Sequence, residues 1–361
     1  MKPTIRRIAV NTGGGDAPGL NAVIRAVVLS GLRRGWQVVG IRKGYLGLLD
    51  EAEDGLIALD ESTVRGITHL GGTILGTSNR GNPFELPDDE GRPVDRGPQV
   101  AESFHRHGLD ALVAIGGDGS LTIANRFYRE FGLPVIGVPK TIDNDLEATE
   151  ATFGFDTAVA TATDAIDKLH PTAQSHERVM VVELMGRYAG WIALHAGVAG
   201  TADVVLIPEI PFDLESVCDK IRRREANGQH FSIVVVAEGA VPEGGEHVFQ
   251  TYGHGQKRLG GMAEKVAEEI RRRTGKETRH LVLGHLQRGG QPTARDRLLS
   301  LRFGAAAVRL AEAGEFGKMV ALSAGGIRAV SLDEATRRVR TVPLDSDLLQ
   351  TARDLGTCLG D

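Results

Sequence analysis

Two aspartates stand two residues apart in the segment 139–145, together with a lysine and a threonine. Carboxylates at this spacing can divide the work of a reaction, with one acting as general base and the other lying beside a metal ion. Thr141 adds a hydroxyl, and Lys140 adds a cation for a phosphate group. A turn rich in aspartate and asparagine is the alternative interpretation. The close grouping with Asp143 and Asp145 favours a catalytic segment.

A glycine-rich stretch at 12–19 stands where an apolar run gives way to a helical pattern. Free backbone N–H groups at the start of a helix favour an anion such as a phosphate. The stretch is not a Walker loop, because no Gly-Lys-Ser/Thr sequence follows it. It also lacks the dinucleotide fingerprint, because Pro18 stands where the third glycine belongs. A tight strand-to-helix turn is the alternative, and the stretch alone does not decide.

A second stretch, 115–120, surrounds one carboxylate with glycines, again where a strand pattern meets a helix pattern. Glycines there let phosphate oxygens approach the backbone. The Asp118 carboxylate can hold Mg²⁺ directly or through water, since Mg²⁺ keeps several waters and takes few protein ligands. The alternative is that Asp118 is the N-cap of the helix that follows. Several kinase families that act on small molecules contain a stretch of this kind.

Basic side chains gather at the ends of two further apolar runs. Arginine binds phosphate oxygens in pairs, so several arginines beside glycines indicate a phosphorylated ligand. Arg80 lies in a loop from which it could reach a transferring phosphate. The runs 222–224 and 271–273 lie in charged helical patterns and are interpreted as solvated helix faces. The residues at the strand ends are His176, Arg178 and Arg187 for the first run, and Arg279, His285 and Arg288 for the second.

The elements that would position these residues repeat as a short apolar run, a glycine loop and an amphipathic stretch. This alternation is typical of an α/β protein with largely parallel sheets, in which ligands bind at the carboxyl ends of the strands. The glycine-rich excursion 241–261 is either a mobile flap or an ordinary insertion, and the pattern does not decide. The expected strands are 8–10, 37–41, 111–115, 135–138, 179–182, 232–237 and 281–283, and two expected helices are 21–33 and 121–130.

The 361 residues suit two domains, and a hydrophobic share of 41% allows each to bury a core. A net charge of −5 excludes a globally basic surface for nucleic acid. Cys218 and Cys358 fit neither a disulfide framework nor a metal site, which suits a reducing compartment. No apolar run approaches the length of about eighteen residues that a membrane helix needs, and the N-terminus has no signal-peptide core. We therefore expect a soluble, cytoplasmic protein without a membrane or nucleic-acid partner.

Six motifs, in order along nearly the whole chain, resemble the phosphofructokinase family, and six matches by chance are far rarer than one. The resemblance implies two Rossmann-like domains with largely parallel sheets and an active site in the cleft between them. The nucleotide- and Mg²⁺-binding domain would comprise 1–154 with 287–337, and the sugar-phosphate-binding domain 155–286 with 338–361. The six motifs are 14–21, 44–47, 116–120, 141–145, 185–187 and 285–290.

The resemblance also implies a reaction and a role for each residue. A 6-phosphofructokinase transfers a phosphoryl group from ATP to the 1-hydroxyl of fructose 6-phosphate in glycolysis, with Mg²⁺. Asp143 would be the general base, Arg80 would steady the transferring group and Asp118 would bind Mg²⁺. Thr141 would support catalysis at the same site. The donor would be lined by Gly15, Tyr45, Arg80, Gly117, Gly119 and Ser120, and the sugar phosphate by Thr141, Asp143, Asp145, Met185, Gly186, Arg187, Glu238, His285 and Arg288.

Members of this family also share residues between subunits and respond to effectors. In the family, Arg178 and Arg279 reach the 6-phosphate from a neighbouring subunit, which implies a homo-oligomer, a dimer or a tetramer. The well-known allosteric members carry arginines on the first helix and just before a Gly-Gly-Thr stretch. Here Arg25 is present, but Leu29 and Leu70 stand at the other two places. We therefore expect weak or altered control by ADP and phosphoenolpyruvate.

Two positions bear on the phosphoryl donor, and they disagree. Pyrophosphate users carry a second aspartate where this chain has Gly119, and that side chain would crowd the inner phosphate of ATP. They also carry a lysine, as this chain does at Lys140, where the best-known ATP users have glycine. Mixed patterns occur in an actinobacterial-like branch that uses ATP. We give Gly119 the greater weight, since it leaves room for ATP, and keep pyrophosphate as the alternative.

Two other functions fit part of the pattern. An enzyme resembling the NAD or lipid kinases shares the 116–119 stretch but not the clusters at 141–145 and 285–290. A non-catalytic sensor of sugar phosphates or nucleotides would need a broken catalytic set. Asp118 and Asp143 are both present, which argues against the sensor.

Overall fold

The computed structural model describes residues 4–49, 54–79, 81–88, 90–252 and 256–361. The chain divides into two compact units and passes from one to the other several times. Unit 1 comprises Met1–Ile142, Leu146–Asp156 and Arg288–Val339, and unit 2 comprises Asp143–Asp145, Thr157–Gln287 and Arg340–Asp361. The short segment Asp143–Asp145 therefore groups with unit 2, whereas the sequence placed it in the domain that begins at residue 1.

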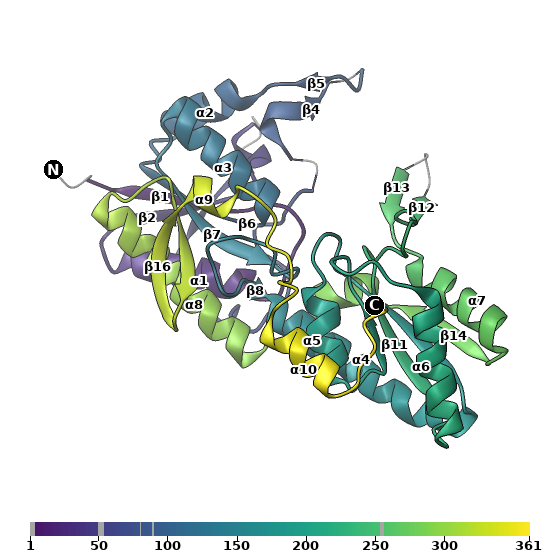
Figure 1. Ribbon diagram of the computed structural model, residues 1–361. Coiled ribbons are helices and arrows are strands. Elements are labelled where there is room, and N and C mark those ends of the chain that lie inside the picture. Colours follow the sequence, from purple (N-terminus) through teal and green to yellow (C-terminus); the bar gives the residue numbers. More distant parts are fainter. Residues whose placement is uncertain (1–3, 50–53, 80, 89, 253–255) are drawn as a thin grey trace. The chain divides into compact units, whose positions relative to one another are not determined.

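Unit 1 is built on an eight-stranded sheet. Its strands are β1 (Arg7–Thr12), β2 (Gln37–Ile41), β3 (Leu56–Leu59), β6 (Ala111–Gly116), β7 (Val135–Thr141), β8 (Phe153–Gly154), β15 (Lys318–Ser323) and β16 (Gly326–Ser331). Their order is β16-β15-β7-β6-β1-β2-β3, with β8 paired to β7 (Figure 1). The inner strands are parallel, and β16 and β3 join the two edges antiparallel. The largely parallel α/β sheet expected from the sequence is confirmed.

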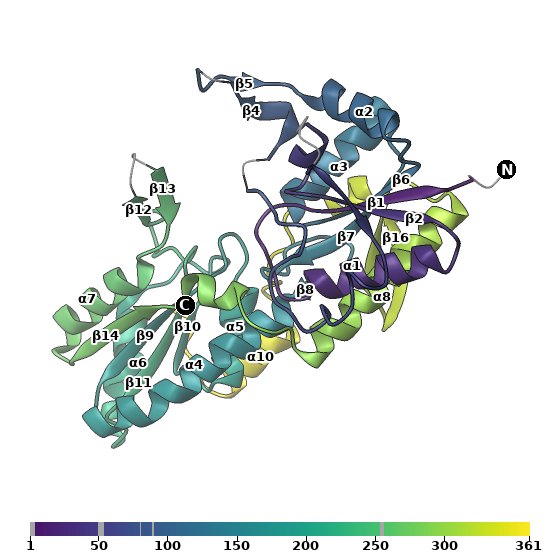
Figure 2. The ribbon, with the colours of Figure 1, turned by 180° about the vertical axis from the view of Figure 1, so that it is seen from behind.

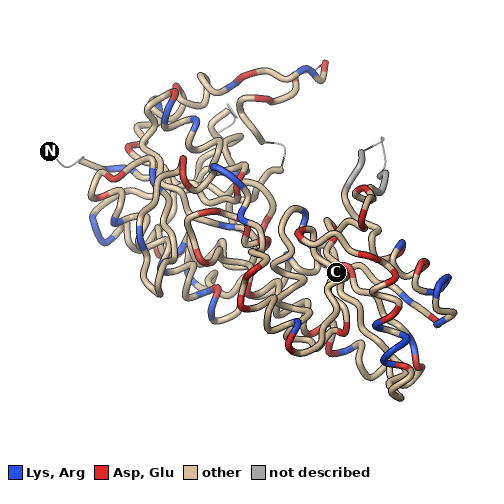
Figure 3. Tube along the Cα trace, viewed as in Figure 1, with Lys and Arg blue, Asp and Glu red and all other residues tan. Residues whose placement is uncertain are grey.

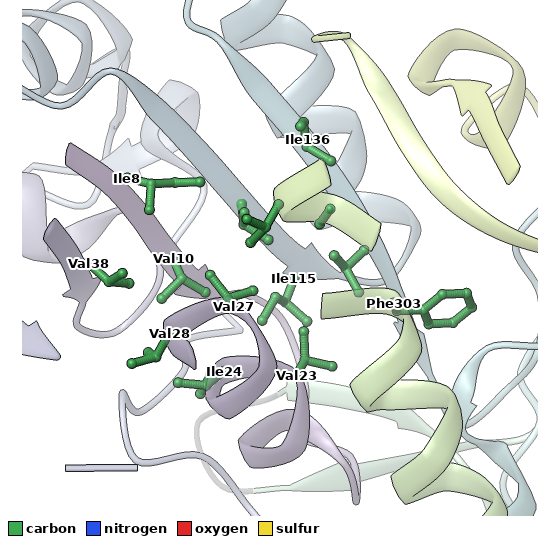
Figure 4. Close-up of a cluster of buried hydrophobic side chains, with 14 of the residues drawn as sticks. Ile8, Val10, Val23, Ile24, Val27, Val28, Val38, Ile115, Ile136 and Phe303 are labelled. Carbon is green, nitrogen blue, oxygen red and sulfur yellow. The ribbon is translucent and has the colours of Figure 1, made fainter. Parts of the chain in front are cut away.

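Successive residues of a strand point to opposite faces of the sheet. The inner strands are apolar on both faces, and helices cover both. The helices are α1 (Leu20–Leu32), α2 (Gly97–Arg106), α3 (Asp118–Phe131) and α8 (Ala294–Ala313). On one face, α1 and α8 pack together on Val10 and Ile115 (Figure 4). On the other face, α2 and α3 pack on Ala9 and Leu112. This packing fixes where α1 and α3 begin, just beyond the ends of β1 and β6.

Unit 2 is built on a smaller sheet. Its strands are β9 (Val179–Leu184), β10 (Val204–Leu206), β11 (Ser232–Ala237) and β14 (Thr278–Val282), and its helices are α4 (Phe155–His176), α5 (Trp191–Ala199), α6 (Leu214–Ala226), α7 (Met262–Thr274) and α10 (Asp347–Asp354). The order is β10-β11-β9-β14, and all three pairs are parallel. Helices α6 and α7 pack together on Val181 and Val234, with α7 beside β14 (Figure 2).

Strand β14 begins earlier than the sequence indicated. We expected a strand at 281–283 with Arg279 before it, whereas β14 contains Arg279 as its second residue. Thr278 pairs with Val179, and the register continues along β9. Hydrogen bonds to β9 therefore set the start of this edge strand. Its exposed polar side chains give no apolar run from which the start could be predicted.

The excursion at 241–261 forms an antiparallel hairpin of β12 (Phe249–Tyr252) and β13 (Gln256–Leu259). Just beyond it, the backbone N–H groups of Gly261 and Ala263 donate to the Glu183 carboxylate at 3.0 and 2.9 Å. This carboxylate is on β9, is only 2% exposed and lies at the start of α7, where free N–H groups stabilise negative charge. One buried side chain therefore fixes the point at which the excursion returns to the sheet.

Two arginine runs lie on α6 and α7, where the tube is coloured blue for Lys and Arg (Figure 3). Members of each run form ion pairs with acidic side chains. Arg222 and Arg273 both contact Glu215, at 2.6 and 3.1 Å. Hydrogen bonds from Arg272 and then Arg273 lower the pKa of Glu269 to about 2. Arg222, Arg272 and Arg273 are thus paired helix-surface charges, as the sequence indicated. Arg271 instead lines a surface hollow of about 260 Å³ beside α7, together with Thr278 and Arg279.

The remaining elements are short. No helix in the described ranges is long and apolar enough to cross a membrane. Cys218 and Cys358 are free thiols. The short elements are β4 (Leu86–Pro87), β5 (Pro93–Val94), α9 (Leu332–Ala335) and 3-10 turns at Leu46–Leu48, Pro83–Glu85 and Gly284–Arg288.

Candidate active site

Three segments that the sequence singled out lie at the carboxyl-terminal ends of neighbouring strands in the unit 1 sheet. β1, β6 and β7 are parallel neighbours in register, so the glycine loop 13–19, the start of α3 and the last residues of β7 lie beside one another. A hydrogen bond of 2.9 Å from the Gly13 N–H to the Ile115 carbonyl ties the first loop to β6. Ligands bind at the carboxyl-terminal ends of the strands in sheets of this kind.

Glycine is required where the first loop approaches the second. A Cβ atom at Gly116 would lie 2.2 Å from the Ser120 Cβ, and one at Gly13 would lie 2.7 Å from the Ser120 hydroxyl oxygen. Both distances are well inside van der Waals contact, so a larger residue would displace Ser120. The glycines therefore bring the backbone of both loops and one hydroxyl together, an arrangement that suits a phosphate group.

Lys140 lies against the first loop. Its side chain is 3% exposed, and its ammonium donates to the Gly15 carbonyl. The Thr77 hydroxyl donates to the neighbouring Gly14 carbonyl at 2.5 Å. The loop thus carries a buried cation, which favours an anionic ligand. The sequence analysis did not assign Thr77 to the site, although its position three residues before Arg80 could have indicated it. Arg80 itself lies outside the described residues.

Asp118 lies at the start of α3, at the edge of the same site. The N-cap residue is Gly117 and Asp118 lies in the first turn, so the alternative of an N-cap aspartate is wrong. The carboxyl group is half-buried, and burial raises its pKa. No described residue donates a hydrogen bond to it. A half-buried carboxylate of this kind beside a phosphate loop fits Mg²⁺, which needs only one or two carboxylates and fills its other positions with water and phosphate oxygens.

Gly119 and Tyr45 differ in what they offer a nucleotide. A Cβ atom at Gly119 would meet nothing within 4 Å, so the space beside the start of α3 is open. Tyr45 is only 5% exposed, and its ring packs on Phe127 with the centroids 4.8 Å apart. Burial raises the pKa of its hydroxyl. Tyr45 therefore supports the loop after β2 from the core, and a direct contact with the nucleotide stays a prediction.

Arg288 also contacts the first loop. Its Nη1 donates to the Asp16 carbonyl at 3.2 Å, and a Cβ atom at Gly15 would lie 2.8 Å from the same nitrogen. The sequence assigned this arginine to the 6-phosphate of the sugar. A guanidinium group has five N–H donors, so the bond to Asp16 leaves others for a phosphate.

The expected catalytic segment follows the end of β7. Thr141 is the last residue of the strand and is 9% exposed. Asp143 and Asp145 are half-buried. Asn144 between them has a φ angle of 52°, in the left-handed region that asparagine tolerates better than most residues. This turn fixes the backbone from which both carboxylates project.

In unit 2, the ends of β9 and β11 meet. The Glu238 N–H donates to the Leu184 carbonyl at 2.8 Å, and the Gly239 N–H donates to the Gly186 carbonyl at 3.2 Å. A Cβ atom at Gly239 would lie 2.0 Å from the Arg187 carbonyl oxygen, so only glycine fits there. The segment after β9 and Glu238 are therefore brought together at the carboxyl ends of two parallel strands.

Gln287 holds a third part of this cluster in place. It is fully buried; its side-chain oxygen accepts a hydrogen bond from the Met185 N–H at 3.3 Å, and its amide donates to the Gly284 carbonyl at 3.1 Å. The turn that carries His285 is thereby tied to the backbone of Met185. The sequence showed Gln287 only as an unassigned member of a motif.

Arg178 and Arg279 are brought together, but away from this cluster. Both guanidinium groups contact the Glu277 carboxylate, at 3.0 and 2.6 Å. They lie at the amino ends of β9 and β14, whereas Met185 and His285 lie beyond the carboxyl ends. At about 3.3 Å of rise per residue, the two groups are roughly 20 Å apart. The two arginines therefore do not share a ligand with Met185 and His285 of the same chain.

A surface hollow of about 540 Å³ lies beside α1 and is lined in part by Arg25, Leu29, Arg33 and Arg65. Leu29 contributes no positive charge to this hollow, as the sequence indicated. Arg25, Arg33 and Arg65 together contribute three positive charges. Leu70 is 44% exposed. The weak response to anionic effectors stays a prediction, because the hollow keeps three arginines.

Comparison with known proteins points to one family. The sequence model of the family described as Phosphofructokinase matches residues 7–311, which is most of the chain. This chain belongs to the phosphofructokinase family. A Chloroflexus aggregans protein named ATP-dependent 6-phosphofructokinase is 53% identical over 356 residues, covering 99% of this chain and 98% of that protein. A Streptomyces coelicolor protein named pyrophosphate–fructose 6-phosphate 1-phosphotransferase is 51% identical over 342 residues, covering 93% and 96%.

Solved phosphofructokinases share the fold. The structure of Pichia pastoris phosphofructokinase in the T-state matches with a TM-score of 0.81 and 32% identity, covering 93% of this chain and 36% of that chain. This phosphofructokinase chain thus spans just over a third of the length of the Pichia chain. The family and the α/β fold expected from the motifs are confirmed. Both donors occur among the names of relatives, but the relative named for ATP is matched over 99% of this chain and the relative named for pyrophosphate over 93%.

Proposed function

We propose that this phosphofructokinase transfers the γ-phosphoryl group of ATP to the 1-hydroxyl of fructose 6-phosphate. The Chloroflexus relative named for the ATP-dependent reaction is 53% identical over nearly the whole chain. The observation that carries ATP as the donor is the open space at Gly119, where a side chain would meet nothing within 4 Å. The test is the formation of fructose 1,6-bisphosphate by purified protein with ATP, Mg²⁺ and fructose 6-phosphate. Failure to form that product would refute the assignment.

Phosphoryl transfer asks the protein mainly for position and charge. We assign Asp143 as the general base, which holds the 1-hydroxyl in line with the donor. It takes the hydroxyl proton as the new O–P bond forms and the bond from the γ-phosphorus to the bridging oxygen breaks, so that ADP leaves. Thr141 and Asp145 flank it, one at the end of β7 and one beyond the Asn144 turn. Arg80 is assigned to the transferring group from its sequence position alone.

On the donor side, the first glycine loop, Gly117 and Ser120 would bind the phosphates, and Gly119 would leave them room. Asp118 would hold Mg²⁺, as its half-buried carboxyl group allows. When bound, Mg²⁺ supplies positive charge next to the phosphoryl oxygens. On the acceptor side, the sugar phosphate would be bound by Met185, Gly186, Arg187, Glu238, His285 and Arg288.

Gln287→Ala should raise the KM for fructose 6-phosphate by about tenfold and change the KM for ATP by less than about twofold. The part-buried Met185 N–H would lose its partner, and leaving a buried donor unpaired costs on the order of 1–3 kcal/mol. Steady-state kinetics measures both constants, and Gln350→Ala, at an exposed glutamine of α10, is the matched control. A folded Gln287 variant with an unchanged KM for the sugar would show that this tie does not shape the site.

We further propose that Arg178 and Arg279 bind the 6-phosphate in the site of a neighbouring subunit of a homo-oligomer. Their distance from Met185 and His285 of the same chain supports this assignment. Arg279→Ala and Asp143→Asn should each be nearly inactive alone. Co-expressed with different tags, they should recover about a quarter of the wild-type activity, because half of randomly paired dimers hold one site with both residues intact. If verified mixed oligomers recovered no activity, the arginine and the base would belong to the site of the same chain.

Pyrophosphate is the second candidate donor, because Lys140 occupies the position that resembles pyrophosphate users. Its ammonium is already bonded to the Gly15 carbonyl, which does not exclude ATP. The Streptomyces relative named for the pyrophosphate reaction is 51% identical. We also propose a cytoplasmic location, the compartment of glycolysis, for the enzyme.

A further inference from the structure

The turn that carries the expected general base is joined to a stretch of chain far along the sequence. The Arg340 N–H donates to the Asp145 carbonyl at 2.8 Å, and its Nη1 donates a longer bond of 3.4 Å to the Asn144 carbonyl. One residue thus holds two consecutive carbonyls of the turn. Asn144 has a φ angle of 52°, in the left-handed region that asparagine tolerates but that its surroundings must still favour. Arg340 is part of those surroundings.

Arg340 is itself held against an aromatic ring. The carbon of its guanidinium group lies 4.5 Å from the centre of the Trp191 ring, at a distance that allows cation–π attraction. The Trp191 indole N–H also donates to the Arg340 carbonyl at 3.0 Å. Trp191 is 8% exposed and is the first residue of α5. Both the backbone and the side chain of Arg340 are therefore fixed by a buried residue of a packed helix.

The residues on either side of Arg340 are tied down as well. Val339 forms an antiparallel bridge with Leu146, just after the turn. The Val342 N–H donates to the Glu209 carboxylate at 2.8 Å, and the same carboxylate accepts from the Gly190 N–H at 3.0 Å. The stretch 339–342 is thus anchored to the turn at one end and to the start of α5 at the other.

We propose that Arg340 is a positioning residue that sets the placement of Asp143 through the backbone of Asn144 and Asp145. This inference rests on the proposed function, in which Asp143 takes the proton of the sugar hydroxyl. Asp143 adjoins the turn, so a shift of the turn moves the base, and a misplacement of about 1 Å can cost on the order of 100-fold in rate. The sugar-binding segment after β9 is held separately, by Gln287 and Gly239. Loss of Arg340 therefore lowers kcat far more than it raises KM.

The kinetic test compares Arg340→Met and Arg340→Lys with Arg337→Met. Arg337 lies just before the same stretch, and its exposed side chain pairs with no described residue, so it is the matched control. We expect Arg340→Met to lower kcat by about 10- to 100-fold with both KM values within about threefold of wild type. Arg340→Lys should recover part of the loss, because lysine keeps the charge but not the planar group that stacks on Trp191. Arg337→Met should behave as wild type.

Hydrogen exchange at the amides of residues 142–147 gives a second readout that does not depend on turnover. Exchange should be at least about tenfold faster in Arg340→Met and unchanged in Arg337→Met, since only the former removes the side-chain bond to the Asn144 carbonyl. If Arg340→Met does not fold, Trp191→Phe, which removes the indole N–H bond to the Arg340 carbonyl, should show the same changes to a smaller degree.

The outcomes separate the two claims. An inactive wild-type enzyme whose turn still opens on loss of Arg340 would refute the proposed reaction and leave the positioning role standing. An active wild-type enzyme with unchanged kcat in Arg340→Met, or with an equal loss in Arg337→Met, would overturn the positioning role. Unchanged exchange in the folded variant would overturn it too.

Discussion

Asp143→Asn should lower kcat by about 10³-fold, because general base catalysis contributes 10²- to 10⁴-fold and asparagine cannot accept the proton. The KM for fructose 6-phosphate should stay within about threefold, since asparagine keeps the size of the side chain and the residues proposed to bind the sugar lie mainly at the ends of β9, β11 and β14. Steady-state kinetics with ATP measures both constants. Thermal unfolding should show that the folded state persists, as the change keeps volume and removes a charge that is half-buried.

The control for this variant is Asp345→Asn, a change of the same chemistry at an exposed aspartate of the C-terminal stretch. It should leave both constants as in wild type. Direct binding of fructose 6-phosphate to Asp143→Asn, measured by calorimetry, separates lost chemistry from lost affinity. A variant that keeps more than about a tenth of the wild-type kcat would contradict the assignment of Asp143, given the range that such bases contribute.

Gly119→Asp should lower kcat/KM for ATP by about 10²- to 10³-fold, because a carboxylate set against a phosphate costs several kcal/mol. The new side chain would project into space that is open in this structure, at the start of α3. The free energy of unfolding should not fall, since an acidic residue in the first turn of a helix is stabilising by about 0.3–1 kcal/mol. The variant should therefore unfold at or above the wild-type temperature while losing ATP turnover.

Gly119→Ala separates size from charge at the same position. Its methyl group should cost ATP turnover less than about tenfold, within the range for one added carbon in a binding site. Pyrophosphate turnover, measured in parallel, should fall less than ATP turnover in Gly119→Asp, because pyrophosphate lacks the inner phosphate that the side chain would crowd. Undiminished ATP turnover in the aspartate variant would show that ATP does not occupy the space beside Gly119.

Much of the fold could be predicted from local pattern. Apolar runs that end in glycine loops placed β1, β6 and β7 and predicted that their loops would share one edge of a sheet, and the register of the strands confirms this. The pattern failed at β14, where polar residues such as Arg279 occupy an edge strand that hydrogen bonds to β9 define. Edge strands need not bury both faces, so their sequences carry a weaker signal.

The parts of the site that were missed depend on contacts between distant residues. Gln287 reaches the Met185 backbone across 102 positions, and Arg340 reaches the Asn144 carbonyl across 196. Hydrophobic periodicity tells which face of an element is buried, but it does not tell which distant backbone group a buried amide or a guanidinium will meet. The same limit applies to Tyr45, which is buried against Phe127 of helix α3.

The most direct test of the account is the ratio of kcat/KM for ATP to that for pyrophosphate, measured with purified wild-type protein, Mg²⁺ and saturating fructose 6-phosphate. The account predicts formation of fructose 1,6-bisphosphate with a ratio well above one, since Gly119 leaves space for the inner phosphates of ATP. A ratio well below one would keep the family and the role of Asp143, but it would contradict ATP as the donor and give Lys140 the greater weight. Absence of product with either donor would contradict the proposed reaction itself.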